Sequence, residues 1–122
     1  MVTRSAAMIT EDDVRRIALA LPETTERPSY GTPGFRVKDR LFARIHQDGG
    51  SLVLWCVSEE EKESLIISEP AVFFAAPHDD GHALVLVRMD AVDAARLGRL
   101  LDDAWEVRAP ARVRRARGAA PS

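Results

Sequence analysis

Residues 34–57, GFRVKDRLFARIHQDGGSLVLWCV, decide the fold class of this chain. Apolar and polar side chains alternate from Phe35 to Lys38 and again from Leu41 to His46, and short polar or glycine-containing turns interrupt the alternation. A period of two residues is typical of strands with one buried face, and an Asp-Gly-Gly turn tolerates positive φ. This stretch therefore predicts three antiparallel strands, at about 35–38, 41–47 and 51–57.

Amphipathic segments on both sides of these strands predict helices. We expect one helix over 10–21 with Thr10 as its N-cap, a short one that follows Ser58 and ends before Pro70, and one over about 93–106. Residues 83–89 predict another strand, and 71–77 predict either an extended edge segment or a loop. Residues 22–33 contain three prolines and predict turns. Together these elements predict an α+β fold, a two-layer sandwich in which the helices cover one face of a mainly antiparallel sheet.

Length and composition predict one domain of ordinary globular type. We expect a disordered leader at 1–9, a single domain at 10–108 and a flexible, Arg-rich tail at 109–122. One cysteine and no long apolar run predict a cytoplasmic protein without disulfides or membrane contact. Five of the 17 basic residues lie in 108–122, so the preceding residues hold 12 basic against all 19 acidic groups, a net −7. An acidic body with a basic tail is compatible with contact to a polyanion or with docking of the tail onto the body.

The residues that could support catalysis do not form a recognisable site. His78 and His82 are separated by Asp79-Asp80-Gly81, which predicts a turn and lacks the helical spacing of a two-histidine metal site. Cys56 lies in an apolar strand, where a thiol is expected to be buried and inert. The chain also lacks a Gly-rich phosphate loop followed by a helix. We therefore expect no enzymatic activity, no metal and no cofactor.

Basic and aromatic residues on the predicted strands and tail are the candidates for binding. Arg36 and Arg44 lie opposite the apolar positions of their strands, and Lys38 and Arg40 lie at a hairpin tip. If Trp55 shares their side, the open sheet face would combine cations with an aromatic ring, as nucleic-acid-binding surfaces do. The tail adds cations that could contact phosphates, namely Arg112, Arg114, Arg115 and Arg117. The alternatives are that an open sheet face is polar by default, that the Trp supports packing, and that the tail is a solvated terminus.

Several motifs in this order resemble the MmcQ/YjbR family. They are Ala20-Leu21-Pro22 with Thr25-Glu26, Gly31-Thr32-Pro33-Gly34-Phe35-Arg36-Val37, Leu41-Phe42-Ala43, Pro70-x-x-Phe73, Asp90-x-Val92-Asp93 and Leu100-Leu101-x-x-Ala104-Trp105. The resemblance covers about residues 10–110 and implies a frataxin-like fold and a non-enzymatic, DNA-binding protein. Within the matched motifs only Arg36 is expected to be exposed. Tyr30 and His82-Ala83 depart from the family's pattern, which usually has a His-like group and a Trp at these places.

A second interpretation assigns the open sheet face to a protein or a small ligand, with Trp55 and Phe42 as apolar anchors. A pocket or continuous apolar patch on that face, with the arginines neutralised by nearby acids, would favour it over DNA. Oligomeric state does not follow from the sequence.

Overall fold

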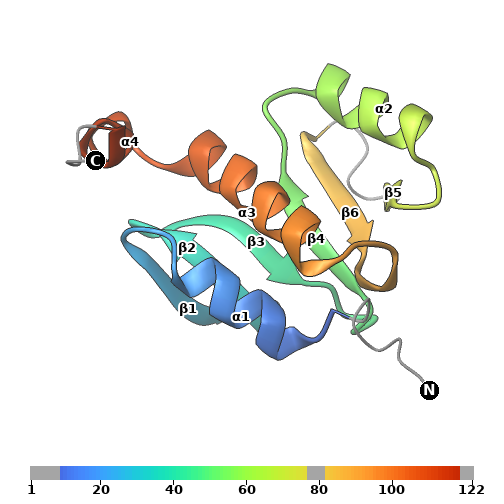
Figure 1. Ribbon diagram of the computed structural model, residues 1–122, viewed down its shortest axis with the longest axis horizontal. Helices are drawn as coiled ribbons and strands as arrows, with labels where there is room; N and C mark the ends of the chain where they lie inside the picture. Colours follow the sequence, from blue (N-terminus) through green and yellow to red (C-terminus); the bar gives the residue numbers. More distant parts are fainter. Residues whose placement is uncertain (1–8, 77–81, 119–122) are drawn as a thin grey trace.

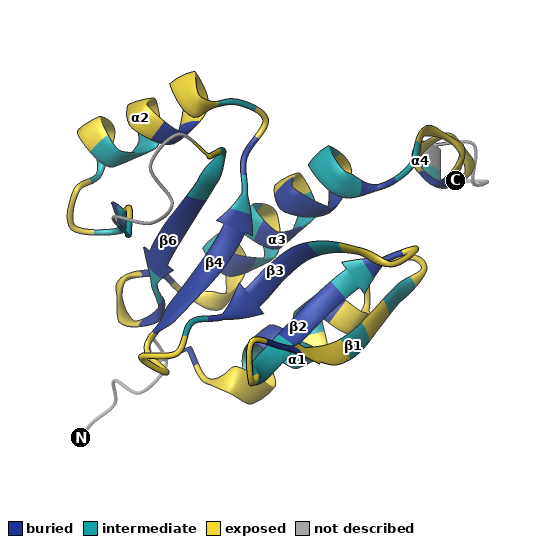
Figure 2. Ribbon diagram, turned by 180° about the vertical axis from the view of Figure 1, so that it is seen from behind, coloured by how far each residue is buried: buried dark blue, intermediate teal, exposed yellow. Residues whose placement is uncertain are grey.

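The computed structural model describes residues 9–76 and 82–118. Its strands form one six-stranded sheet with the order β1-β2-β3-β4-β6-β5, and every neighbouring pair is antiparallel. Figure 1 shows α1 and α3 on one face of this sheet, and Figure 2, seen from behind, shows β3, β4 and β6 in front of α3. The predicted α+β sandwich with helices on one face is confirmed. The strands are β1 Thr24–Ser29, β2 Thr32–Val37, β3 Arg40–Ile45, β4 Ser51–Trp55, β5 Phe73–Phe74 and β6 Leu84–Arg88, and the helices are α1 Glu11–Leu19, α2 Glu59–Ser68, α3 Ala94–Arg108 and α4 Ala111–Gly118, with a 3₁₀ turn at Met89–Ala91.

Local capping defines where the helices begin. The Thr10 hydroxyl accepts a hydrogen bond from the Asp13 amide while the Asp13 carboxylate accepts one from the Thr10 amide, which forms a capping box at the start of α1. Ser58 caps α2, as predicted, through the Glu61 amide. The cap of α3 is Asp93, whose carboxylate accepts from the Arg96 amide. These satisfied N-terminal donors are local, which is why the sequence located the helices well.

The core lies between the sheet and α1, α2 and α3. Its largest fully buried side chains include Trp105, Phe35 and Phe73. The Trp105 indole N–H donates to the Pro22 carbonyl over 2.9 Å, so α3 is tied to the segment between α1 and β1. Because α1 and α3 pack on one face of the sheet, these helices do not cover the opposite face.

Two regions differ from the prediction. Residues 24–29, expected to be a turn, form the edge strand β1, in which Pro28 is tolerated because an edge strand has one unpaired side. Residues 111–118, expected to be flexible, form α4, because Val113 is buried and Arg117 binds Asp102. Most of the expected leader lies outside the described residues, and its last residue, Ile9, is buried. The phenylalanines of the segment at 71–77 form the short edge strand β5.

Candidate functional site

Strand pairing defines the sheet face that points away from the helices. Gly34 pairs with Arg44, Arg44 with Val53 and Val53 with Leu86, so these residues form one row across β2, β3, β4 and β6. The adjacent row contains buried core residues, including Phe35 and Ala43 on β2 and β3. Because side chains alternate along a strand, the Arg44 row lies on the opposite face from the core. We call this side the open face.

A β-bulge in β3 reverses the expected positions of two side chains. Phe35 pairs with Ala43, but Arg36 pairs with Leu41, so β3 holds one extra residue, Phe42, at this point. Phe42 is fully buried with Ala43 in the core, whereas Leu41 lines a cavity on the open face. The prediction that Phe42 is an apolar anchor of the open face is therefore wrong, and Leu41 takes that place.

The open face is hollowed into a cavity of about 580 Å³. This volume is within the range of sites for small ligands and cofactors, which is about 300–1,000 Å³. Leu41, Val53 and Leu84 supply aliphatic surface from three strands, and Trp55 and Tyr30 supply aromatic rings. The complete lining is Tyr30, Leu41, Arg44, Gln47, Val53, Trp55 and Leu84. The cavity is thus mostly apolar, with few polar groups.

Arg44 is the charged group of this cavity. Its residue is 8% exposed, and its guanidinium donates to the Ile45 carbonyl at 3.4 Å and to Gln47 Oε1 at 3.3 Å. The guanidinium carbon lies 5.0 Å from the centre of the Tyr30 ring. Across 9–76 and 82–118, no carboxylate comes within 4.0 Å of it. A buried guanidinium without a counterion is costly, which makes it a candidate for binding an anion.

The hairpin turn between β1 and β2 holds Tyr30 above Arg44. Tyr30 has φ of 54° and Gly31 has φ of 81°, a pair that matches the two-residue turn favoured in hairpins. Positive φ is unusual for a bulky side chain and is found where the surrounding structure enforces it. Gln47 helps to hold Tyr30 in this conformation, because its side-chain amide donates to the Tyr30 carbonyl over 3.3 Å. The ring therefore stands at the rim of the cavity, 78% exposed.

Arg108, the last residue of α3, lies beside the cavity and contacts two of its lining residues, Leu41 and Trp55. Its Nε donates to the Leu41 carbonyl over 2.8 Å, and its guanidinium carbon lies 5.3 Å from the centre of the Trp55 ring. Burial first, and then the positive charge of Arg40, lower the pKa of Arg108. Arg40 itself donates to the Arg108 carbonyl at 3.3 Å. Two cations therefore approach each other beside Trp55.

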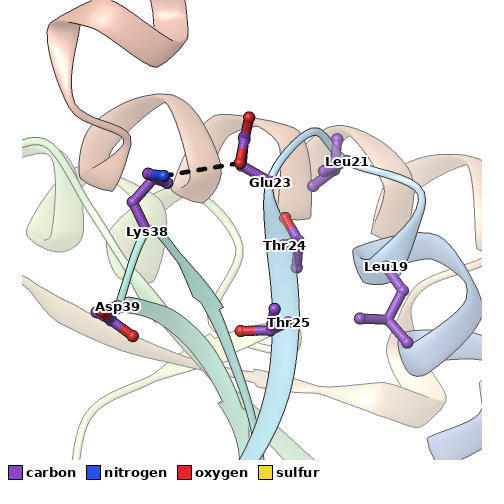
Figure 3. Close-up of a pocket in the computed structure, with 7 residues that line it drawn as sticks. All are labelled: Leu19, Leu21, Glu23, Thr24, Thr25, Lys38 and Asp39. Atoms are coloured by element: carbon purple, nitrogen blue, oxygen red, sulfur yellow. Dashed lines mark ion pairs between the residues drawn. The ribbon is translucent and has the colours of Figure 1, made fainter.

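The predicted strand residues divide between two sides of the sheet. Arg36, Arg44 and Trp55 belong to the open face, whereas Arg40 reaches the end of α3. Lys38 faces a different hollow, of about 440 Å³, where it forms an ion pair with Glu23 at 3.9 Å (Figure 3). That hollow is also lined by Leu19, Leu21, Thr24, Thr25 and Asp39. Since its cation is already paired and no aromatic ring lines it, this hollow is a weaker candidate than the open-face cavity.

The predicted tail arginines are also distributed. Arg117 binds Asp102 through two contacts of 2.8 Å and Glu106 through one of 3.0 Å, and these contacts raise its pKa. Arg114 donates to the Ala109 carbonyl. Arg112 and Arg115 are exposed on α4. Arg114 and Arg117 thus make contacts that hold α4, whereas Arg112 and Arg115 make no such contact with the described residues.

The structure offers little support for metal binding or a reactive thiol. Over the described ranges, no cluster of three or more His, Cys, Asp or Glu side chains could hold a metal ion. His78 lies outside these ranges. Burial and then the charge of Glu61 raise the pKa of Cys56 to about 11, which keeps this thiol protonated near neutral pH. Among the helices that are described, none has the length and apolar character needed to cross a membrane.

Sequence reasoning missed most of the cavity lining. Tyr30 was noted only as a departure from a family pattern, and Arg108 only as part of the basic tail. The positive φ at Tyr30 follows from the short connection between β1 and β2, which was not recognised because β1 was assigned to a turn. Arg108 belongs to α3, which extends two residues beyond its predicted end at about 106.

Comparisons with known proteins agree with this geometry. The chain is 34% identical to uncharacterised proteins of Mycobacterium bovis and Mycobacterium tuberculosis, and each match covers 84% of this chain and 91% of the relative. A crystal structure of a Deinococcus radiodurans protein, with a domain described as DUF419, matches with a TM-score of 0.66 and 27% identity over 84% of this chain and 80% of that one. The model of the YjbR family matches residues 19–107. The chain therefore belongs to the YjbR family.

Proposed function

We propose that this protein is a binding module that takes a small anionic ligand in the open-face cavity. The observation that carries the proposal is Arg44, a nine-tenths buried guanidinium that lines an apolar cavity and has no carboxylate partner among the described residues. A ligand anion would supply the missing counterion, and charge-assisted hydrogen bonds to arginine are the stronger kind. Trp55, Leu41 and Val53 would cover the apolar part of the ligand. The proposal includes no chemical reaction.

The distribution of positive charge favours a small ligand over a DNA duplex. A duplex is bound mainly through many exposed cations that contact phosphates. Here Arg44 is buried, Lys38 is paired with Glu23, and Arg117 is paired with Asp102. The cavity, in contrast, combines apolar surface with one unpaired cation in a hollow of about 580 Å³, which suits a ligand of limited size.

DNA binding, implied by the family resemblance, is the second candidate. One observation favours it: Arg112 and Arg115 are exposed on α4 and form no ion pair with the described part of the chain. Contacts from these two residues would be to phosphate and would not read sequence. The interaction would be strongly weakened by salt.

Nuclear magnetic resonance can test the small-ligand proposal with a biphenyl that carries one para-carboxylate. Addition of this probe should shift the Trp55 indole N–H signal and leave that of Trp105 unchanged, because Trp105 is buried and bonded to Pro22. Arg44→Gln should weaken binding about tenfold or more, the loss expected for one charge-assisted hydrogen bond. The matched control is Arg16→Gln, which removes an exposed charge from α1. Unchanged affinity in Arg44→Gln, or no shift at Trp55 at millimolar probe, would refute the proposal.

A gel-shift titration with duplex DNA tests the second candidate separately. If about six phosphates are contacted, the affinity should fall roughly 10³-fold between about 50 and 200 mM salt. Arg112→Gln combined with Arg115→Gln should weaken this binding, whereas Arg44→Gln should not. A shift that depends on Arg44 and Arg36 instead would mean that the open face binds the duplex, contrary to the small-ligand proposal.

A further inference from the structure

The open-face cavity has one cation in its lining and a second beside it, and neither has an acidic partner within 9–76 and 82–118. Arg44 lies beneath Tyr30, and Arg108 lies against Trp55. Within the described residues, the Arg108 side chain forms one hydrogen bond, from Nε to the Leu41 carbonyl. A guanidinium has five N–H donors, so the four on the Nη atoms have no hydrogen-bond partner within the described chain. No carboxylate in the same ranges lies within 4.0 Å of Arg108.

Arg40 lies next to Arg108, and Arg36 lies across the sheet from Leu41, the residue to which Arg108 is bonded. Arg40 is close enough for its charge to lower the pKa of Arg108. Arg36 pairs with Leu41 across the sheet, and its Nε is buried without a hydrogen-bond partner among the described residues. A buried polar atom that lacks a partner is rare in proteins and calls for an explanation. An anion held beside Leu41 would provide one and would also relieve the repulsion between Arg40 and Arg108.

A purely structural role accounts for only part of this arrangement. The Arg40 side chain donates to the Arg108 carbonyl and so satisfies one of the last acceptors of α3. The Arg108 Nε donates in turn to the carbonyl of Leu41, next to the bulge in β3. These two bonds explain why the side chains are ordered, but they leave the positive charges of Arg40 and Arg108 without a counterion among the described residues.

The spacing of the carbonyls that bind the two cations follows from β3. The carbonyls bonded by Arg108 and Arg44 belong to Leu41 and Ile45, four residues apart on that strand. At about 3.3 Å per residue they are separated by about 13 Å, and the bulge at Phe42 shortens this distance. The two carbonyls are therefore on the order of 10 Å apart, and each accepts a hydrogen bond from one of the two guanidinium groups.

We propose that the ligand of this cavity is an elongated dianion with a flat apolar middle. One anionic group binds Arg44, and the second binds Arg108 with the help of Arg36 and Arg40. This inference rests on the proposed function, because it assigns a second anion site to the same cavity. It also explains why the cations of an otherwise acidic body gather in and beside one apolar hollow.

The test compares two probes that differ by one charge. A biphenyl with a carboxylate at each end is titrated by calorimetry beside the biphenyl with a single para-carboxylate. The dicarboxylate should bind about ten- to a hundredfold more tightly, the gain expected for one additional charge-assisted hydrogen bond. Arg108→Gln should remove this gain and leave the affinity for the monocarboxylate unchanged. Arg44→Gln should weaken the binding of both probes.

Two more variants control for misfolding and for general charge effects. Arg36→Gln removes a side chain that forms no hydrogen bond or ion pair in the described structure, so it should preserve the fold and still reduce the dicarboxylate affinity by about threefold or more. Arg99→Gln removes an exposed charge from α3 on the opposite side of the sheet and should change neither affinity. Circular dichroism confirms that each variant is folded.

The outcomes separate this inference from the function on which it rests. Equal affinity for both probes, with sensitivity to Arg44→Gln, overturns the dianion and retains the single-anion site. The dianion proposal is also overturned if the dicarboxylate still binds more tightly than the monocarboxylate in Arg108→Gln and in Arg36→Gln. If neither probe responds to Arg44→Gln, the proposed function itself is wrong.

Discussion

Replacement of Arg44 by methionine should stabilise the protein while it removes the ligand site. Arg44 is buried, faces an apolar cavity and has no acidic partner among the described residues. A methionine of similar length would keep the packing against Val53 and Trp55 and remove the unpaired charge. Replacement of buried charges by apolar side chains is often neutral or stabilising, by about 1–4 kcal/mol.

The expected gain can be worked out from the contacts that Arg44 makes. Removal of the charge relieves its desolvation penalty, which is several kcal/mol for a buried ion and is taken here as about 2–4 kcal/mol. Loss of the Tyr30 ring contact costs about 0.5–1 kcal/mol. The two hydrogen bonds, at 3.3 and 3.4 Å, are long and cost about 0.5 kcal/mol each. A net gain of about 1 kcal/mol remains, which raises the Tm by about 4 °C if the unfolding entropy is about 2.1 cal/mol/K for each of 122 residues.

Urea unfolding followed by circular dichroism measures this gain directly. The control is Arg16→Met, in which an exposed arginine of α1 is replaced and no stabilisation is expected. In parallel, Arg44→Met should lose the shift of the Trp55 indole signal caused by the biphenyl carboxylate. A destabilisation of more than about 1 kcal/mol would refute the reasoning, because it would mean that the protein itself holds this charge favourably.

Three further predictions follow from other parts of the chain. Gly34→Ala should destabilise the fold by about 1–3 kcal/mol in urea unfolding, because its Cβ would lie 2.9 Å from the Ser29 Cβ and 3.0 Å from a backbone carbonyl. Cys56 should resist alkylation at pH 8 and react quickly in urea. Because folding raises the pKa of its thiol from 9.0 to about 11, the stability that this shift contributes is complete below pH 9 and is lost as the pH rises through about 11. Arg117→Ala should increase amide hydrogen exchange throughout α4, since the contact to Asp102 is lost, and an equal increase in Arg115→Ala would show that this contact does not hold the helix.

Much of the fold could be predicted from local patterns. The alternation at 35–37 located β2, and the run of β-branched and aromatic residues that begins at Ser51 located β4. Capping residues such as Thr10 and Ser58 located α1 and α2. These signals are local, since a strand's period and a helix's cap involve residues only a few positions apart. The segment at 24–29 was missed because its prolines are typical of turns, and only pairing with β2 makes it an edge strand.

The candidate site was predictable only in part. Alternation correctly assigned Arg36 and Arg44 to the side opposite the core. It failed at Leu41 and Phe42, because both are apolar and a bulge of one residue changes which of them faces the helices. Arg40 was expected at a hairpin tip, and only the tertiary structure shows that its side chain donates to the Arg108 carbonyl at the end of α3.

The amino-acid sequence by itself determined the α+β class, the antiparallel strands and the family to which the chain belongs, because periodicity, caps and motif order are properties of neighbouring residues. The tertiary structure alone decided that Tyr30, Arg44 and Trp55 line one cavity and that Arg108 lies against Trp55. These residues come from a hairpin turn, two strands and the end of a helix, and their burial and charge environment exist only once the sheet has been assembled.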